Sequence, residues 1–81
     1  MNRFDLVDRI AARNNISKAE ADRVVVSVFE EIMSAVTMGD SVTLIGFGSF
    51  RAVESVRKPK FVAGTYFREI VNKYEGIKDE E

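Results

Sequence analysis

The stretch VTLIGFGSF at residues 42–50 decides the fold, because a strand-type run is interrupted by two closely spaced glycines. β-branched, aliphatic and aromatic residues at this density indicate short strands. Gly46 and Gly48 permit a bend or a bulge between them. A second informative stretch, PKFVAG, follows only a few residues later, at residues 59–64.

Two further strands are predicted beyond this stretch. Phe50, Ala52, Val53 and Val56 form the next strand-type run, and residues 60–63 form a third, very short one. Between them we expect a tight turn at residues 57–59, because proline fixes its own φ and moves the preceding residue out of the helical region.

The first 39 residues predict two helices. From Arg3 to about Asn14, apolar residues recur at helical spacing with charged residues between them. The sequence SKAE at residues 17–20 is a capping box for a second, longer helix, and Gly39 suits its left-handed C-terminal cap. Residues 24–28 are rich in valine, which is a strand signal, but the cap and the long helical period outweigh it.

A last helix starts at Gly64-Thr65 and carries apolar residues as far as Tyr74. The whole chain is therefore predicted to be one α+β domain. Its expected segments are helices over 1–39, a sheet over 40–64, a helix over 65–75 and an acidic tail over 76–81.

The size and composition of the chain predict association. With 81 residues, a chain buries only about 60% of the surface that it exposes when unfolded. Cysteine and histidine are absent, so neither disulfides nor thiolate zinc sites can stabilise the fold. An apolar fraction of 46%, with six phenylalanines, is more than a small monomer readily hides. We therefore expect a dimer with a shared core.

The same absences narrow the chemistry. Without histidine or cysteine the chain has no Ser-His-Asp arrangement and no thiol nucleophile, so we predict a protein that is not an enzyme and needs no cofactor or metal. Gly46-x-Gly48 lacks the third glycine of a nucleotide-binding loop and leads into a strand. No apolar run is long enough to span a membrane and the N-terminus is not a signal peptide, so we expect a cytoplasmic protein.

Charge is distributed unevenly along the chain. The formal net charge is −1, but residues 51–68 contain five basic residues and one acidic residue. The flanking segments are both acidic on balance. A polyanion is therefore expected to meet the middle segment.

In the order helix, capped helix, three strands and helix around V-x-L-x-G-F-G-x-F, the chain resembles the histone-like HU and integration host factor proteins. The pattern P-x-F-x-A-G-x-x-F-R at residues 59–68 strengthens the resemblance. The family implies an intertwined homodimer in which strands of both chains form a saddle above a helical base. The resemblance implies a dimer core that includes Phe29, Leu44, Phe47, Phe50 and Phe61.

The chain departs from the family between its second and third strands. Family members extend these strands into a long β-arm with a G-R-N-P-x-T-G type motif, whose proline enters the minor groove and kinks DNA. Here the arm is missing. Pro59 is not that proline, because it matches the one just before the core phenylalanine Phe61.

The resemblance implies phosphate contacts by the body of the protein. Arg3 and Lys18 fall on such family positions, whereas Thr65 replaces a common lysine. The residues we expect to bind DNA are Arg3, Lys18, Arg51, Arg57, Lys58, Lys60 and Arg68. For the group around Lys58, charges that protect a sheet edge are nearly as good an explanation.

Two functions remain open at this point. The first is a homodimer in the bacterial nucleoid, or in host cytoplasm if a virus encodes it, that binds double-stranded DNA weakly, without sequence specificity and without proline intercalation. A pI near 5.5 argues for weak binding. The alternative is an interaction protein that pairs with a full-length HU-like relative or binds another protein.

Overall fold

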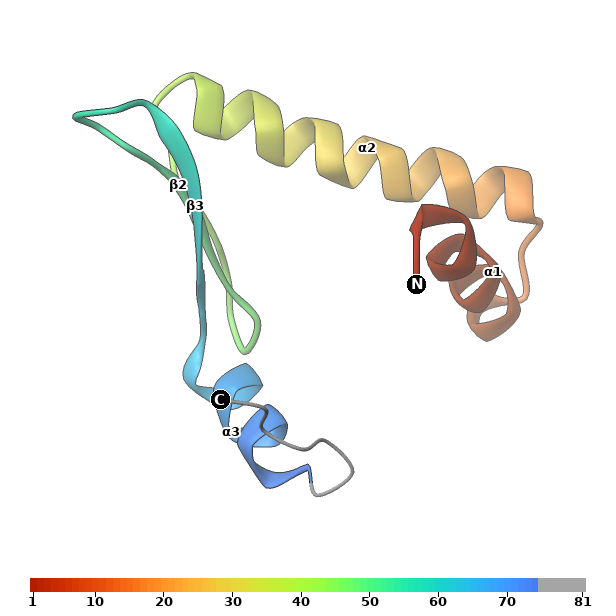
Figure 1. Ribbon diagram of the computed structural model, residues 1–81. Helices are drawn as coiled ribbons and strands as arrows, with labels where there is room; N and C mark the ends of the chain where they lie inside the picture. Colours follow the sequence, from red (N-terminus) through yellow and green to blue (C-terminus); the bar gives the residue numbers. More distant parts are fainter. Residues whose placement is uncertain (75–81) are drawn as a thin grey trace. The chain divides into compact units, whose positions relative to one another are not determined.

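The computed structural model describes residues 1–74 and has the predicted α+β order of elements (Figure 1). It divides into two compact units, Met1–Ser34 and a second that begins at Ala35. The elements are α1 (Arg3–Asn14), α2 (Lys18–Thr37), β1 (Val42–Leu44), β2 (Gly48–Val53), β3 (Lys58–Ala63) and α3 (Thr65–Lys73).

Helix α1 begins with a capping box that the sequence analysis overlooked. The Asn2 side chain accepts a hydrogen bond from the Asp5 amide, and the Asp5 carboxylate accepts one from the Asn2 amide, both at 3.0 Å. The helix ends where Asn15 takes a left-handed conformation with φ of 56°, which asparagine tolerates better than most residues. Local side-chain chemistry therefore sets both ends of α1.

The predicted capping box of α2 is confirmed. The Glu20 amide donates to Ser17 Oγ at 3.0 Å, and the Ser17 amide donates to Glu20 Oε1 at 3.3 Å. The valine-rich run is helical, as predicted. Buried residues Val7 and Ala11 of α1 pack with Ala21 and Val25 of α2 in a small core.

The C-terminal end of α2 confirms the predicted role of Gly39, which has φ of 92°. The Asp40 amide donates to the Ala35 carbonyl and the Gly39 amide to the Val36 carbonyl, both at 3.0 Å. This is the Schellman arrangement, which satisfies two of the carbonyls left over at a helix end.

The three strands form one antiparallel sheet in the order β1-β2-β3. Phe50 of β2 lies opposite both Val42 of β1 and Phe61 of β3. Because side chains alternate between the faces of a strand, this register gives the sheet one apolar and one largely polar face. The apolar face consists of Val42, Leu44, Gly48, Phe50, Ala52, Pro59, Phe61 and Ala63.

The predicted turn at residues 57–59 is wrong. The turn is Glu54–Arg57, and β3 is a six-residue strand that already includes Lys58 and Pro59. Val56 lies in the turn and not in a strand. Proline is tolerated here because β3 is an edge strand of the sheet. The reversal instead uses Arg57, whose φ of 55° is left-handed.

The last helix is shorter than expected, because it ends at Lys73 and Tyr74 already has extended backbone angles. The predicted acidic tail over 76–81 lies outside the described residues.

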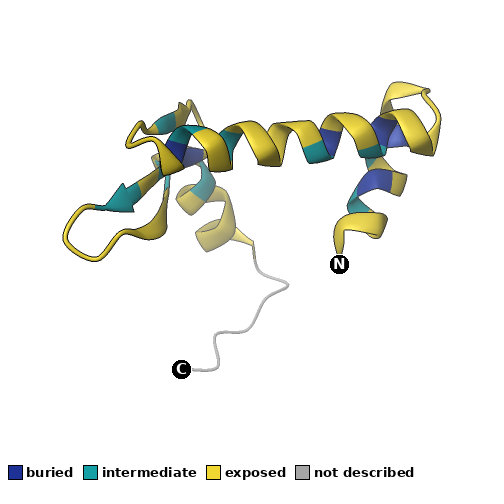
Figure 2. Ribbon diagram, turned by 90° about the horizontal axis from the view of Figure 1, so that it is seen from above, coloured by how far each residue is buried: buried dark blue, intermediate teal, exposed yellow. Residues whose placement is uncertain are grey.

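Four phenylalanine rings gather in the second unit. The Phe47 centroid lies 5.2 Å from that of Phe61 and 5.4 Å from that of Phe67, and the Phe50 and Phe61 centroids are 4.8 Å apart. We call Phe47, Phe50, Phe61 and Phe67 the phenylalanine cluster. Most of the chain is exposed in the single protomer (Figure 2), and Phe47 and Phe61 keep 44% and 39% of their surface exposed.

Gly48 is the tightest point of this cluster. A Cβ atom at Gly48 would lie 2.5 Å from the Val62 carbonyl oxygen and 2.6 Å from the Phe61 ring, and φ is 156°. We expect Gly48→Ala to lower the free energy of unfolding by about 2–4 kcal/mol, measured by urea denaturation.

Gly39→Ala is the matched control, because Gly39 also has a positive φ but nothing within 4 Å of its added Cβ. It should lose only about 1–2 kcal/mol, from the backbone conformation. Equal losses for the two variants would contradict the steric role of Gly48.

Candidate nucleic-acid interface

The polar face of the sheet carries three cations. Arg51 of β2 lies directly opposite Lys60 of β3, and Lys58 is two residues before Lys60 on the same face. We call Arg51, Lys58 and Lys60 the cationic face. All three residues are exposed, so solvent and large ligands reach them.

Within residues 1–74, no acidic side chain forms an ion pair with the cationic face. The ion pairs found in residues 1–74 are Arg3–Asp22 and Lys18–Asp8, both in the first unit. Like charges directly opposite on neighbouring strands are destabilising. The Arg51–Lys60 pair is therefore a like-charged cross-strand pair without an ion-pair partner in residues 1–74.

Edge protection explains only part of this arrangement. Lys58 and Lys60 lie on β3, an edge of the three-stranded sheet, where charges discourage pairing with other chains. Arg51 lies on β2, the central strand. A charge on a central strand protects no edge. The position of Arg51 on β2 therefore supports a role in ligand binding.

Two hydroxyl groups extend the polar face beside Arg51. Thr43 Oγ1 and Ser49 Oγ lie 3.2 Å apart, across β1 and β2. Hydroxyl groups of this kind are common donors to phosphate oxygens. The sequence analysis did not predict them. Thr43 and Ser49 alternate with the apolar residues of 42–50, and this alternation could have indicated that they lie on the polar face.

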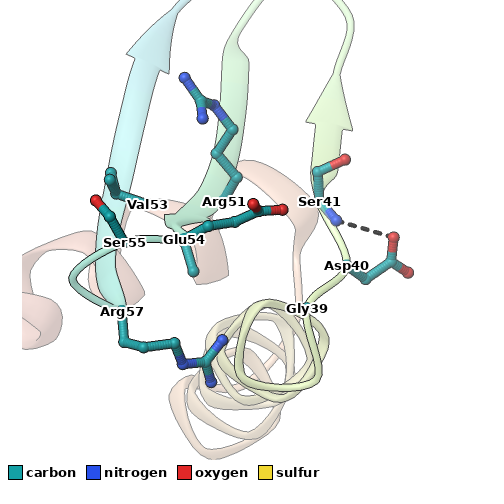
Figure 3. Close-up of a pocket in the computed structure, with 9 residues that line it drawn as sticks. Gly39, Asp40, Ser41, Arg51, Val53, Glu54, Ser55 and Arg57 are labelled. Carbon is teal, nitrogen blue, oxygen red and sulfur yellow. Dashed lines mark hydrogen bonds between the residues drawn. The ribbon is translucent and has the colours of Figure 1, made fainter.

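Arg57 is separated from the cationic face. Its guanidinium donates to the Thr37 carbonyl at the end of α2, at 3.0 Å. Figure 3 shows Arg57 extending to that helix end near Gly39, whereas Arg51 points away along the sheet. The hollow between these segments is lined by residues 39–41, 51–55 and Arg57, and in it the Asp40 carboxylate accepts a hydrogen bond from the Ser41 amide at 2.8 Å.

The remaining predicted cations lie elsewhere. Arg3 Nε is 3.1 Å from Asp22 Oδ1, and Lys18 Nζ is 3.5 Å from Asp8 Oδ1. Both are exposed pairs of the first unit, and such pairs contribute little free energy. Arg68 is on α3, where its guanidinium lies 3.4 Å from Thr65 Oγ1.

The predicted dimer-core residues are incompletely buried in one chain. Leu44 and Phe47 keep 41% and 44% of their surface exposed, and Phe29 in the first unit keeps 42%. Phe67 joins the phenylalanine cluster although it was not among the predicted core residues. Within one chain, the Leu44 and Phe61 side chains on the apolar face of the sheet are therefore only partly covered.

Residues 1–74 offer few other sites. They contain no group of three or more acidic, cysteine or histidine side chains that could hold a metal ion. A membrane-crossing helix would have to be longer or more apolar than any helix in this part of the chain.

Comparisons with known proteins agree with the fold and the motifs. Residues 1–58 match the family model described as bacterial DNA-binding protein. DNA-binding protein HU of a Nostoc species is 38% identical over 89 residues, which cover 88% of this chain and 95% of that protein.

Solved structures give the same result. HU of Anabaena, in a cocrystal with DNA, has a TM-score of 0.79 at 35% identity, covering 91% of this chain and 100% of that one. HU from Thermotoga maritima also has a TM-score of 0.79, at 34% identity, covering 88% of this chain and 98% of that one.

The alignment lengths are consistent with a shortened hairpin. Since 88% of 81 residues is about 71, about 18 of the 89 positions aligned with the Nostoc protein have no counterpart here. The family match ends at Lys58, where β3 begins. On the matched residues and the shared fold, this chain belongs to the HU family of bacterial DNA-binding proteins.

Proposed function

We propose that this chain is a homodimeric architectural protein that binds double-stranded DNA weakly through its phosphates, without sequence specificity. The observation that carries the proposal is the Arg51–Lys60 pair, two like charges held opposite each other without a neutralising acid in the described chain. Phosphates of a bound polyanion would supply the negative charge that this pair lacks, and binding would therefore relieve the repulsion between Arg51 and Lys60.

A homodimer is supported by the exposed apolar side chains. Leu44 and Phe61 on the apolar face of the sheet, and Val28, Phe29 and Met33 on α2, keep between 39% and 60% of their surface exposed in one chain. A second copy would cover such surfaces and complete the core that a small domain lacks. The two-fold symmetry would also double the cationic face.

Proline intercalation is excluded from the proposal by the length of the hairpin. β2 and β3 are joined by the four-residue turn Glu54–Arg57, so no arm extends beyond the sheet to reach into a groove. Pro59 pairs with Ala52 inside the sheet instead of standing at a tip. Binding would therefore rest on the cationic face, with Arg3, Lys18 and Arg68 as weaker additional contacts.

The salt dependence of binding tests this proposal. The three cations of the cationic face would contact about six phosphates in a dimer, so they alone should contribute a slope of about −5 to log K against log salt. Arg51→Gln and Lys60→Gln should each make that slope shallower by about two. Mobility shifts with a short duplex between 20 and 200 mM salt, roughly the range in which such contacts weaken, give the slope.

Arg23→Gln is the control for this experiment, because Arg23 is exposed on α2 and forms neither of the two described ion pairs. It removes the same charge but should leave the slope unchanged. If the unmodified protein does not shift DNA even near 20 mM salt, where phosphate contacts are strongest, the proposal is wrong.

The dimer is tested separately by dilution. Because unfolding of an obligate dimer releases two chains, each tenfold dilution should lower the Tm by about 4 °C, whereas a monomer would show no shift. Differential scanning fluorimetry over a hundredfold concentration range, with sedimentation velocity at the lowest concentration, measures both. A stable folded monomer at the lowest concentration would exclude the shared core.

A second candidate function is pairing with an HU-type relative that has a full-length arm. The observation in its favour is the place of the shortening, because the turn Glu54–Arg57 lies beyond the Val53–Lys58 pair. The Gly48–Ala63 pair and the cluster residue Phe47 lie at the other end of the hairpin. The apolar face is thus unaffected by the loss of the arm.

Co-expression with such a relative distinguishes this candidate. Native mass spectrometry should then show a species of intermediate mass beside the two homodimers. If only homodimers form after the chains are unfolded and refolded together, exchange between armed and armless chains does not occur.

A further inference from the structure

We infer that Arg57 is a clamp that fastens the shortened hairpin to the end of α2, and that it does not contact phosphate. This inference goes beyond the proposed function, which treats the sheet as a ready-made surface. The phosphate half of the inference rests on the proposed function, whereas the clamp can be tested without DNA.

The first observation concerns which donors form hydrogen bonds with the last carbonyl groups of α2. The last carbonyls of a helix have no partner within it. The Schellman arrangement supplies donors to the Ala35 and Val36 carbonyls. The next carbonyl is that of Thr37, and its donor is the Arg57 guanidinium at 3.0 Å.

The second observation is the electrostatics of this contact. The C-terminal end of a helix carries a partial negative charge, which favours a cation. None of the residues in the last turn of α2 is basic. Arg57, twenty residues further along the chain, therefore provides the cation that the helix itself lacks.

The third observation is the backbone of the turn. The Val56 and Arg57 amides both donate to the Val53 carbonyl, at 3.3 and 2.7 Å. This closes the turn only because Arg57 has φ of 55°, a conformation that residues with a Cβ rarely adopt. Glycine or asparagine would suit this position better. The presence of arginine is explained by its long side chain, which reaches the Thr37 carbonyl (Figure 3).

These observations explain why Arg57 and Lys58 play different parts although they are adjacent. Arg57 faces the helix end, whereas Lys58 opens β3 on the cationic face. By fixing the turn, Arg57 positions the first cation of β3. Its own charge is engaged by the helix and is not available to DNA.

The test compares Arg57→Asn with Arg57→Lys. Asparagine keeps the left-handed turn without strain but cannot reach Thr37, while lysine keeps both a donor and the charge. Opening of the turn is measured by the rate at which a glutamate-specific protease cuts after Glu54. We expect cleavage about tenfold faster for Arg57→Asn, an intermediate rate for Arg57→Lys, and no change for Lys60→Gln.

The salt slope of DNA binding gives the second readout. In a Lys58→Gln background, where the cation that Arg57 positions is already absent, Arg57→Asn should leave the slope unchanged, whereas Lys60→Gln should make it shallower by about two. In a Lys58→Gln background, Arg57→Asn should cost less affinity than it does alone, because its effect acts through Lys58.

The outcomes separate the two proposals. Unchanged cleavage after Glu54 in Arg57→Asn overturns the clamp, whether or not DNA binds. In the Lys58→Gln background, a slope shallower by about two for Arg57→Asn shows a phosphate contact by Arg57 itself and overturns the other half of the inference. Failure of the unmodified protein to bind DNA removes the proposed function but leaves the cleavage comparison decisive.

Discussion

The close approach of the Phe61 ring to the backbone at Gly48 is the constraint on which the second unit depends. An added Cβ would lie 2.6 Å from that ring, so only glycine allows Phe61 to lie across β2. With the ring in this place, Phe47 and Phe50 pack against it within 5.2 Å between centroids. The contact therefore fixes which side of the sheet is apolar.

Fixing one face of a sheet fixes the other, because a slip of one residue would exchange them. The same register that places Phe50 opposite Phe61 places Arg51 opposite Lys60. The like-charged pair is thus held by the aromatic packing beneath it, and its side chains cannot avoid each other by a shift of the strand. The same strand register therefore stabilises the apolar face and brings the like charges of the cationic face together.

The sequence predicted the helices well because their ends are encoded locally. Ser17 and Glu20 form the expected capping box, and Gly39 has the expected left-handed conformation. The hairpin was placed wrongly because Pro59 suggested a turn, whereas an edge strand accommodates it. Arg57, Lys58 and Lys60 are neighbours in sequence, but only the register and the Thr37 contact separate their roles. Neither of these long-range features has a local sequence signal.

The shortened hairpin also limits what binding could do to DNA. Bending a site of 20–30 base pairs by 40–90° costs about 1–6 kcal/mol, which contacts along the bent duplex must offset. In proteins that kink DNA, an apolar wedge between base pairs localises that bend. Here Arg57 holds the turn against α2, and the cations of the sheet lie on strands whose positions the phenylalanine cluster fixes. The proposed contact by the cationic face would follow the phosphates of a straight duplex, and it includes no side chain from residues 1–74 that would enter between base pairs. The proposed activity is therefore contact with straight DNA, in which the number of phosphates neutralised sets the affinity.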